Sequence, residues 1–256
     1  YGAKRPEMVG YAVHTSVAFS LLSGAFIMII GIILAPRMLG AMSTPEDIMD
    51  LSILYLRIYF LGMIPNLLYN TGSSILRAVG DSRRPLYFLI VSCMTNIVLD
   101  LLFVVILRLG VRGAGIATVC SQILSALLVL SCLCRSSDMY RVHLTRIGID
   151  TRMLRRMIRI GLPAGLQSVM YGLSNVIIQA GINSLGTNTV ASWAAYGKID
   201  SIFWMIINSF GIAITTFVGQ NYGAGKHERI HRGVRVCMGM TIISSIMISA
   251  LVYFLG

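Results

Sequence analysis

Seven apolar runs dominate the sequence and constrain its fold more than any other feature. Each is about as long as a bilayer-spanning helix, because roughly 20 residues at ~1.5 Å rise cross the hydrocarbon core. Overall, 56% of the residues are apolar and only 12% are charged, which is typical of a multi-pass membrane protein and excludes an ordinary soluble domain. The expected spans are residues 10–34, 52–76, 86–107, 113–134, 160–184, 191–218 and 233–255.

The runs predict an all-α fold whose main partner is the lipid bilayer. Pro65 lies inside the second run and predicts a kink or a local break there. The sixth run is longer than a bilayer requires, so we expect it to tilt or bend. The chain starts at Tyr1 rather than Met, and its last run reaches the final residues. We therefore expect it to be part of a longer protein.

Basic residues alternate between loops, and this alternation predicts the orientation of the chain. The formal net charge is +11, from 21 Lys and Arg against 10 Asp and Glu. Sixteen of the 21 lie before the first span or in every second loop, whereas the other loops carry Arg37, Arg108 and Arg112. Because cytoplasmic loops are enriched in Lys and Arg, we expect the first set in the cytoplasm. The charge reports topology, and no nucleic-acid partner is expected.

A long basic loop divides the chain into two lobes. It covers residues 136–159, and its end, TRMLRRMIRIG, has the pattern of a basic amphipathic helix on the inner leaflet. We expect the first lobe at 1–135 and the second at 160–256. The sequence YGAK at residues 1–4 is matched by YGAGK at 222–226, each before a span. This parallel repeat contains six spans, so the intact protein is expected to have twelve.

Three polar residues in the third and fourth runs form a candidate cation site. Asn96 and Asp100 are spaced i,i+4 and share a helix face. Thr118 follows the turn by about as many residues as Asp100 precedes it, so we expect the two at similar depth. An all-oxygen cluster suits a hard cation or a proton. The alternative is that Asp100 snorkels to the outer interface while Asn96 and Thr118 serve helix packing.

A zinc-protease signature also occurs, and its surroundings argue against it. Residues 227–231 read HERIH, a literal H-E-x-x-H. The neighbouring cations Lys226 and Arg229 disfavour Zn²⁺, and His14 and His143 offer no evident third ligand. A membrane zinc metalloprotease is kept as a remote alternative. We expect a solvated helix start, with no metal site and no catalytic residue.

Five motifs occur along the chain in a fixed order. They are ILRAVGD at 75–81 followed by Arg84-Pro85, NIVLD at 96–100, GAGIAT at 113–118, GLPAG at 161–165 and VGQNYGAGK at 218–226. Together they resemble the multidrug and toxic compound extrusion (MATE) transporters, in the prokaryotic, DinF-like part of that family.

The resemblance implies a bundle of twelve helices in two six-helix lobes, of which this chain is expected to hold helices three to nine. It implies an antiporter, not an enzyme, that exports organic and often cationic drugs or metabolites in exchange for Na⁺ or H⁺. Such a protein is monomeric, has no cofactor beyond the coupling ion, and lies in the inner (plasma) membrane of a prokaryote.

The resemblance also implies roles for particular residues. The family's first-lobe cation site uses an Asp on helix one, an Asn and an Asp on helix five, and a Thr on helix six. Asn96, Asp100 and Thr118 match the last three, and Ala114 matches a backbone neighbour of that site. The helix-one Asp has no counterpart among these spans.

The second lobe departs from the family pattern. Some members carry a Glu on helix seven where this chain has Tyr171, so an acidic site is not expected there. Asn175 and Gln179 give that helix a polar face, which serves either packing or a substrate. Lys198 and Asp200 in the sixth run either line a polar cavity or snorkel outward. These four residues are the candidate substrate cavity.

A lipid-linked oligosaccharide flippase of a related superfamily is the main alternative function. It requires several cationic residues to hold a pyrophosphate, whereas only Arg57 and Lys198 are expected within the membrane.

Overall fold

The computed structural model describes residues 1–41, 45–183 and 186–255, and within these ranges it contains helices and no strand. The helices are α1 Pro6–Ala41, α2 Glu46–Leu61, α3 Met63–Ala78, α4 Arg83–Asp100, α5 Val111–Arg135, α6 Thr151–Asn183, α7 Thr187–Gly223 and α8 His227–Leu255. A π-helical segment, Leu101–Ile106, continues α4, and a short 3₁₀ turn, Leu144–Arg146, lies before α6. The all-α prediction is confirmed.

Hydropathy supports six of the seven expected spans. Five are the single helices α1, α4 with its π-helical continuation, α5, α7 and α8, and the sixth is the bent pair α2–α3. The expected span at 160–184, whose last residue lies outside the described ranges, falls within α6. By its composition, α6 is not among the helices that are apolar enough to cross a membrane. Its apolar residues are interrupted by Gly, Ser, Asn and Gln. The predicted amphipathic helix of the linker is the first part of this same continuous helix.

The predicted break in the second span is confirmed, but it lies three residues before the proline. Helices α2 and α3 meet at Gly62 with a bend of 42°. Pro65 lacks the N–H that would bond to the carbonyl four residues earlier, so the disruption falls on the preceding turn. There the Gly62 N–H donates to the Tyr59 carbonyl at 3.0 Å, a tighter turn than the α-helix has.

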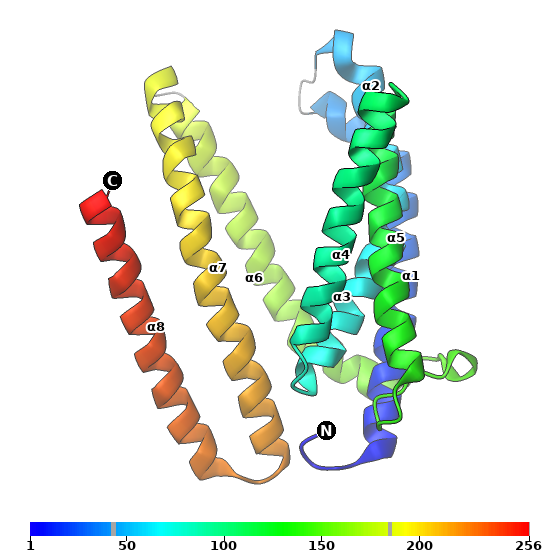
Figure 1. Cartoon of the computed structure of the whole chain (residues 1–256), viewed down its shortest axis with the longest axis vertical. Coiled ribbons are helices and arrows are strands. Elements are labelled where there is room, and N and C mark those ends of the chain that lie inside the picture. Colours follow the sequence, from blue (N-terminus) through cyan, green and yellow to red (C-terminus); the bar gives the residue numbers. More distant parts are fainter. Residues whose placement is uncertain (42–44, 184–185, 256) are drawn as a thin grey trace. The chain divides into compact units, whose positions relative to one another are not determined.

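The chain forms two compact units, and their boundary falls within the predicted linker. The first, Arg5–Leu154, contains α1 to α5 and the segment that follows α5 (Figure 1). It is the four-helix unit, in which the bent α2–α3 pair counts as one helix, and the unit with α6 to α8 is the three-helix unit. Here α1, the α2–α3 pair, α4 and α5 pack against one another. Small residues allow close approach, as where Gly72 faces Val129 and Leu133. The buried hydrophobic core consists of Val13, Val17, Leu68, Leu76, Ala126, Val129, Leu133, Tyr140 and Val142.

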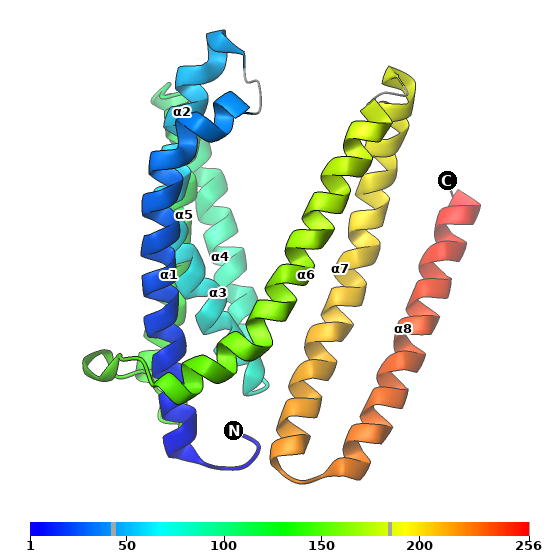
Figure 2. The ribbon, with the colours of Figure 1, turned by 180° about the vertical axis from the view of Figure 1, so that it is seen from behind.

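The second unit consists of the described part of Arg155–Gly256, with Tyr1–Lys4. Helices α7 and α8 pack as an antiparallel hairpin (Figure 2). The described side chains of α6, α7 and α8 are half-buried or exposed, and none is buried. The helices are long: α7 has 37 residues, or about 55 Å at ~1.5 Å per residue.

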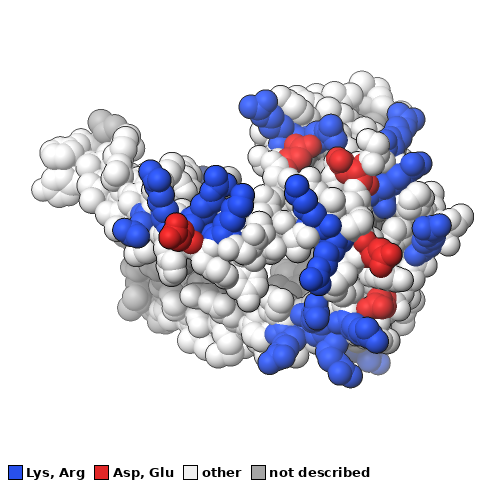
Figure 3. All heavy atoms as spheres, turned by 90° about the horizontal axis from the view of Figure 1, so that it is seen from below, with Lys and Arg blue, Asp and Glu red and all other residues white. Residues whose placement is uncertain are grey.

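In the first unit, basic side chains gather at one end of the helices (Figure 3). This end holds the start of α1, the turn between α3 and α4, and the segment after α5. Arg37, Arg108 and Arg112 lie on elements at the opposite end. The alternation of basic loops therefore coincides with the ends of the helices, as the predicted topology requires.

Candidate cation site

Asn96 and Asp100 lie on the last two turns of α4, on the face predicted from their spacing. Both residues are half-buried. The Asn96 Nδ2 and the Asp100 Oδ1 are shielded from solvent and have no hydrogen-bond partner within the described structure. A buried polar atom without a partner costs free energy, on the order of 1–3 kcal/mol and more for a charged group. A hydrogen-bond partner or an ion next to these two atoms would remove that cost.

Thr118 on α5 is held by its own helix. Its hydroxyl donates to the Ala114 carbonyl, one turn earlier, at 3.0 Å. This bond uses the hydroxyl proton, so the lone pairs of the Thr118 oxygen remain as acceptors. The Ala114 backbone carbonyl is thus the acceptor of the Thr118 hydroxyl, and its part in a cation site stays a prediction.

The hairpin of α4 and α5 brings these residues to neighbouring helices. The Ser92 hydroxyl donates to the Ser121 carbonyl at 2.6 Å, and Gly113 lies against Phe103. These two contacts lie on either side of Asn96 and Asp100 along α4, so both residues run alongside the part of α5 that holds Ala114 and Thr118. That Asp100 and Thr118 share one depth stays a prediction.

A π-helical segment begins directly after Asp100. Its widened turns close with bonds such as Leu107 N–H to the Leu102 carbonyl at 2.9 Å. Such segments are rare and occur often at functional sites, because they rotate the following side chains and loosen the helix locally. The residues LLFVVI carry no signal that would have predicted it.

Gln122 is a polar residue that the sequence analysis missed. It follows Thr118 by one turn on α5, and its Oε1 is shielded from solvent without a partner in the described structure. The amide lies against Gly62, at the break between α2 and α3, where no Cβ would fit. Its i,i+4 spacing from Thr118 in an apolar run was a usable signal.

The candidate substrate residues lie in the second unit, on α6 and α7. Asn175, Gln179 and Lys198 are exposed and Asp200 is half-buried. The Gln179 amide donates to the Asn183 Oδ1 at 2.8 Å, and the Tyr196 hydroxyl donates to the Asp200 Oδ1 at 3.4 Å. These bonds run along single helices and do not join the four residues into one cluster.

The H-E-x-x-H residues occupy the first turns of α8. Over the described ranges, no three His, Cys, Asp or Glu side chains come together as a metal would require.

Known proteins are similar to this chain both in sequence and in the arrangement of their helices. The family model MatE matches residues 1–102 and 163–256. The chain belongs to the MatE family. The resemblance to MATE transporters is thereby confirmed. The chain is a multi-pass membrane protein of the kind found in the bacterial inner membrane.

Two relatives illustrate the range of the family. The probable multidrug resistance protein YoeA of Bacillus subtilis is 32% identical over 262 residues, covering 99% of this chain and 56% of the relative. The FAD transporter of Shewanella oneidensis is 23% identical over 238 residues, covering 90% of this chain and 52% of the relative. The chain therefore spans about half the length of these relatives.

Solved structures show the same fold. A MOP superfamily transporter from Pyrococcus furiosus superposes with a TM-score of 0.91 at 24% identity, over 100% of this chain and 57% of that one. A MATE transporter in its straight conformation gives a TM-score of 0.89 at 25% identity, over 98% and 56%.

Proposed function

We propose that the full-length protein is a secondary antiporter that exports small organic compounds in exchange for Na⁺ or H⁺. Asp100 is the group that carries the proposal, because its Oδ1 is buried among apolar helices without a partner. A carboxylate in a membrane span costs a few kcal/mol, and a bound cation or proton removes that cost.

Asn96, Ala114 and Thr118 complete the proposed site around Asp100. The Thr118 oxygen keeps acceptor lone pairs because its proton is used on the Ala114 carbonyl. Rotation of the Asn96 amide exchanges its nitrogen and oxygen in nearly the same place, so it can offer oxygen to Na⁺ or an N–H to a carboxylate. These groups are hard oxygen donors, which suits Na⁺ or H⁺ and not a soft metal.

The mechanism that follows is alternating access. Neutralising Asp100 changes the stability of any arrangement in which it is buried by several kcal/mol, enough to invert a two-state equilibrium. The π-helical segment after Asp100 and the break at Gly62 are the places where the four-helix unit departs from regular helix. They are the proposed flexing points. Cation entry and substrate release then favour opposite states.

The substrate is proposed to contact the second unit. Asn175, Gln179, Lys198 and Asp200 are polar side chains on helices with no buried face of their own. Both signs of charge are present, which fits an organic compound and does not fit the cationic cavity of a pyrophosphate flippase. We further propose a monomeric transporter, without enzymatic activity, cofactor or nucleic-acid partner.

Replacing Asp100 tests the proposal. Asp100→Asn keeps the shape and removes the titratable charge, so the full-length protein in proteoliposomes should lose export driven by an imposed Na⁺ or H⁺ gradient, by about 100-fold or more if ~3 kcal/mol of coupling is lost. Asn96→Ala and Thr118→Ala remove one neutral ligand each and should cost about tenfold.

Asp81→Asn is the matched control, because Asp81 pairs with Arg84 at 3.2 Å in an exposed turn and should leave export within about twofold of the wild type. Wild-type export by Asp100→Asn would mean that Asp100 is an interfacial residue, and the proposed site would be wrong.

A further inference from the structure

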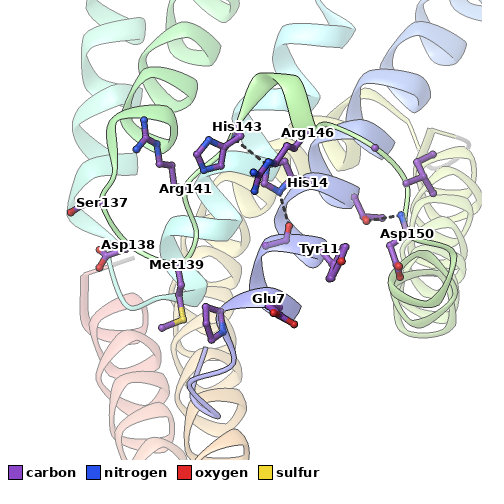
Figure 4. A pocket seen from close by; sticks show the side chains of 15 residues that line it. Glu7, Tyr11, His14, Ser137, Asp138, Met139, Arg141, His143, Arg146 and Asp150 are labelled. Carbon is purple, nitrogen blue, oxygen red and sulfur yellow. Dashed lines mark hydrogen bonds between the residues drawn. The ribbon is translucent and has the colours of Figure 1, made fainter.

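A pocket of about 870 Å³ lies in the four-helix unit, between the start of α1 and the segment 136–150 that follows α5 (Figure 4). Its titratable and charged residues come from both elements, and none belongs to the cation site. They are Glu7, Tyr11 and His14 on α1, with Asp138, Arg141, His143, Arg146 and Asp150 on the segment. The pocket lies at the end that the basic loops predict to be cytoplasmic.

Two hydrogen bonds fasten the segment to α1 across this pocket. The His143 backbone N–H donates to the His14 Nε2 at 3.0 Å, and the Asp150 backbone N–H donates to the Thr15 hydroxyl at 3.0 Å. The two imidazole rings stack with centroids 6.2 Å apart and planes 6° apart. Thr15 is fully buried, whereas His14 borders the open pocket and is accessible to protons.

The first bond requires a neutral His14. Its Nε2 accepts a hydrogen bond, so this nitrogen carries no proton. The proton is on Nδ1, which lies 2.7 Å from the Gly10 carbonyl and donates to it. A second proton on Nε2 would set two donors against each other at 3.0 Å, and the bond to His143 would be lost. The Asp150–Thr15 bond has no such dependence on protonation.

Some charges around the pocket favour and others oppose a positive charge on the two imidazole rings. Arg141 and Arg146 oppose a positive charge on either ring, whereas Glu7, Asp138 and Asp150 favour it. For His143, partial removal of water from the ring, then Arg141, Arg146 and His14, lowers the pKa below its ordinary value.

We propose that His14 is a pH-sensitive latch that holds the segment 143–149 on α1 at neutral pH and releases it when the cytoplasm becomes acidic. The contact exists only with neutral His14, and histidine is the side chain whose charge commonly changes between about pH 5 and 8. It is therefore lost when the His14 Nε2 takes up a proton. Release is local, because the buried Tyr140 and Val142 hold one side of the segment and the Asp150–Thr15 bond holds the other.

The latch acts on the chain that connects the two units. Leu144 is 66% exposed, and most of the neighbouring residues up to Ile149 are exposed as well, whereas Ile147 packs against the core. Release would loosen this stretch just before α6, while Asp150 stays bonded to Thr15. This inference concerns the linker alone and does not depend on which ion or compound is transported.

Hydrogen exchange of the full-length protein in lipid nanodiscs tests the latch directly. After correction for intrinsic exchange, the protection of the His143 amide should fall up to about tenfold per pH unit below the histidine range, as loss of one proton-linked contact requires. The Val142 amide, which donates to the Leu133 carbonyl at 3.2 Å, should keep its protection. Equal loss at Val142 would indicate general unfolding and overturn the proposal.

Three variants separate the roles of the two histidines. His14→Gln keeps an acceptor that does not titrate, so protection at His143 should persist and no longer depend on pH. His14→Ala should lose protection at every pH, and His143→Gln keeps the backbone donor and should respond to pH like the wild type. Unchanged pH dependence in His14→Gln, or its disappearance in His143→Gln, would overturn the assignment of His14.

Discussion

The four-helix unit and the three-helix unit have similar composition and very different packing. In the first, a continuous core runs from Val13 on α1 to Val142 after α5. In the second, the described side chains of α6 to α8 include no buried residue. Both sets of helices are apolar enough for lipid, apart from α6. Hydropathy alone thus identifies helices that lie in a membrane, but it does not say which faces meet other helices.

Glycine shows the same contrast at single positions. A Cβ on Gly72 would come within 2.7 Å of a methyl group of Val129, which is fully buried. On α7 and α8, Gly211 and Gly239 have open space around them. The same residue type permits close helix packing in one unit, whereas in the other a Cβ at these two positions would have no neighbour within 4 Å among the described residues.

Buried polar atoms without partners are also confined to one unit. Within the described residues they belong to Ser73, Asn96, Asp100 and Gln122, all in the four-helix unit. In the other unit, polar side chains such as Ser168 and Asn208 are exposed and bond within their own helices. Burial makes a polar group costly, so the packed unit is where an ion can change the free energy most.

The largest expected difference between the units is in the cost of removing a leucine side chain. Leu76 is fully buried in the core, whereas Leu251 on α8 is 60% exposed. Leu76→Ala should destabilise the full-length protein by about 2–5 kcal/mol through lost burial and a cavity. Leu251→Ala should cost less than about 1 kcal/mol. Denaturant unfolding in detergent measures both, and equal costs would show that α8 is as well packed in the intact protein as the four-helix core.

Replacing one glycine in each unit by alanine should change the free energy of unfolding in opposite directions. Gly72→Ala forces a methyl group against Val129 and Leu133, and should cost about 1–3 kcal/mol by overpacking. Gly211→Ala adds a methyl group in open space on α7 and should stabilise by up to about 1 kcal/mol, because glycine loses more entropy on forming a helix. The same unfolding measurement applies, and a destabilised Gly211→Ala would reveal a close helix neighbour at that point.

Most of this difference in packing between the two units could not be predicted from the sequence. Apolar runs located the spans and paired α4 with α5, because a short turn between two runs requires an antiparallel hairpin. The apolar runs gave helix lengths that are too short, since α1 has 36 residues where the run suggested 25. Hydropathy marks the part of a helix that contacts lipid. The helix itself can continue beyond that part, because its ends are set by capping residues and turns.

The candidate site was predictable in part. The shared face of Asn96 and Asp100 followed from their i,i+4 spacing, and the structure has it. Their register against Thr118 did not follow, because it depends on the π-helical segment and on the Ser92–Ser121 bond. The His14–His143 contact joins residues 129 positions apart and has no local signal at all.

The smallest expected effect concerns single serine hydroxyls. Ser92→Ala removes the 2.6 Å bond from α4 to the Ser121 carbonyl of α5, and should cost about 0.5–1.5 kcal/mol, the usual range for one buried bond between helices. Ser174→Ala is the matched control, because its exposed hydroxyl bonds only to the Met170 carbonyl of its own helix at 2.9 Å. That change should stay within about 0.5 kcal/mol of the wild type. Because the Ser92 bond joins α4 to α5 one turn before Asn96, Ser92→Ala should weaken cation-coupled export slightly, whereas Ser174→Ala should not. If both serines behave alike in unfolding and in export, the register of α4 on α5 is set by apolar packing and not by this bond.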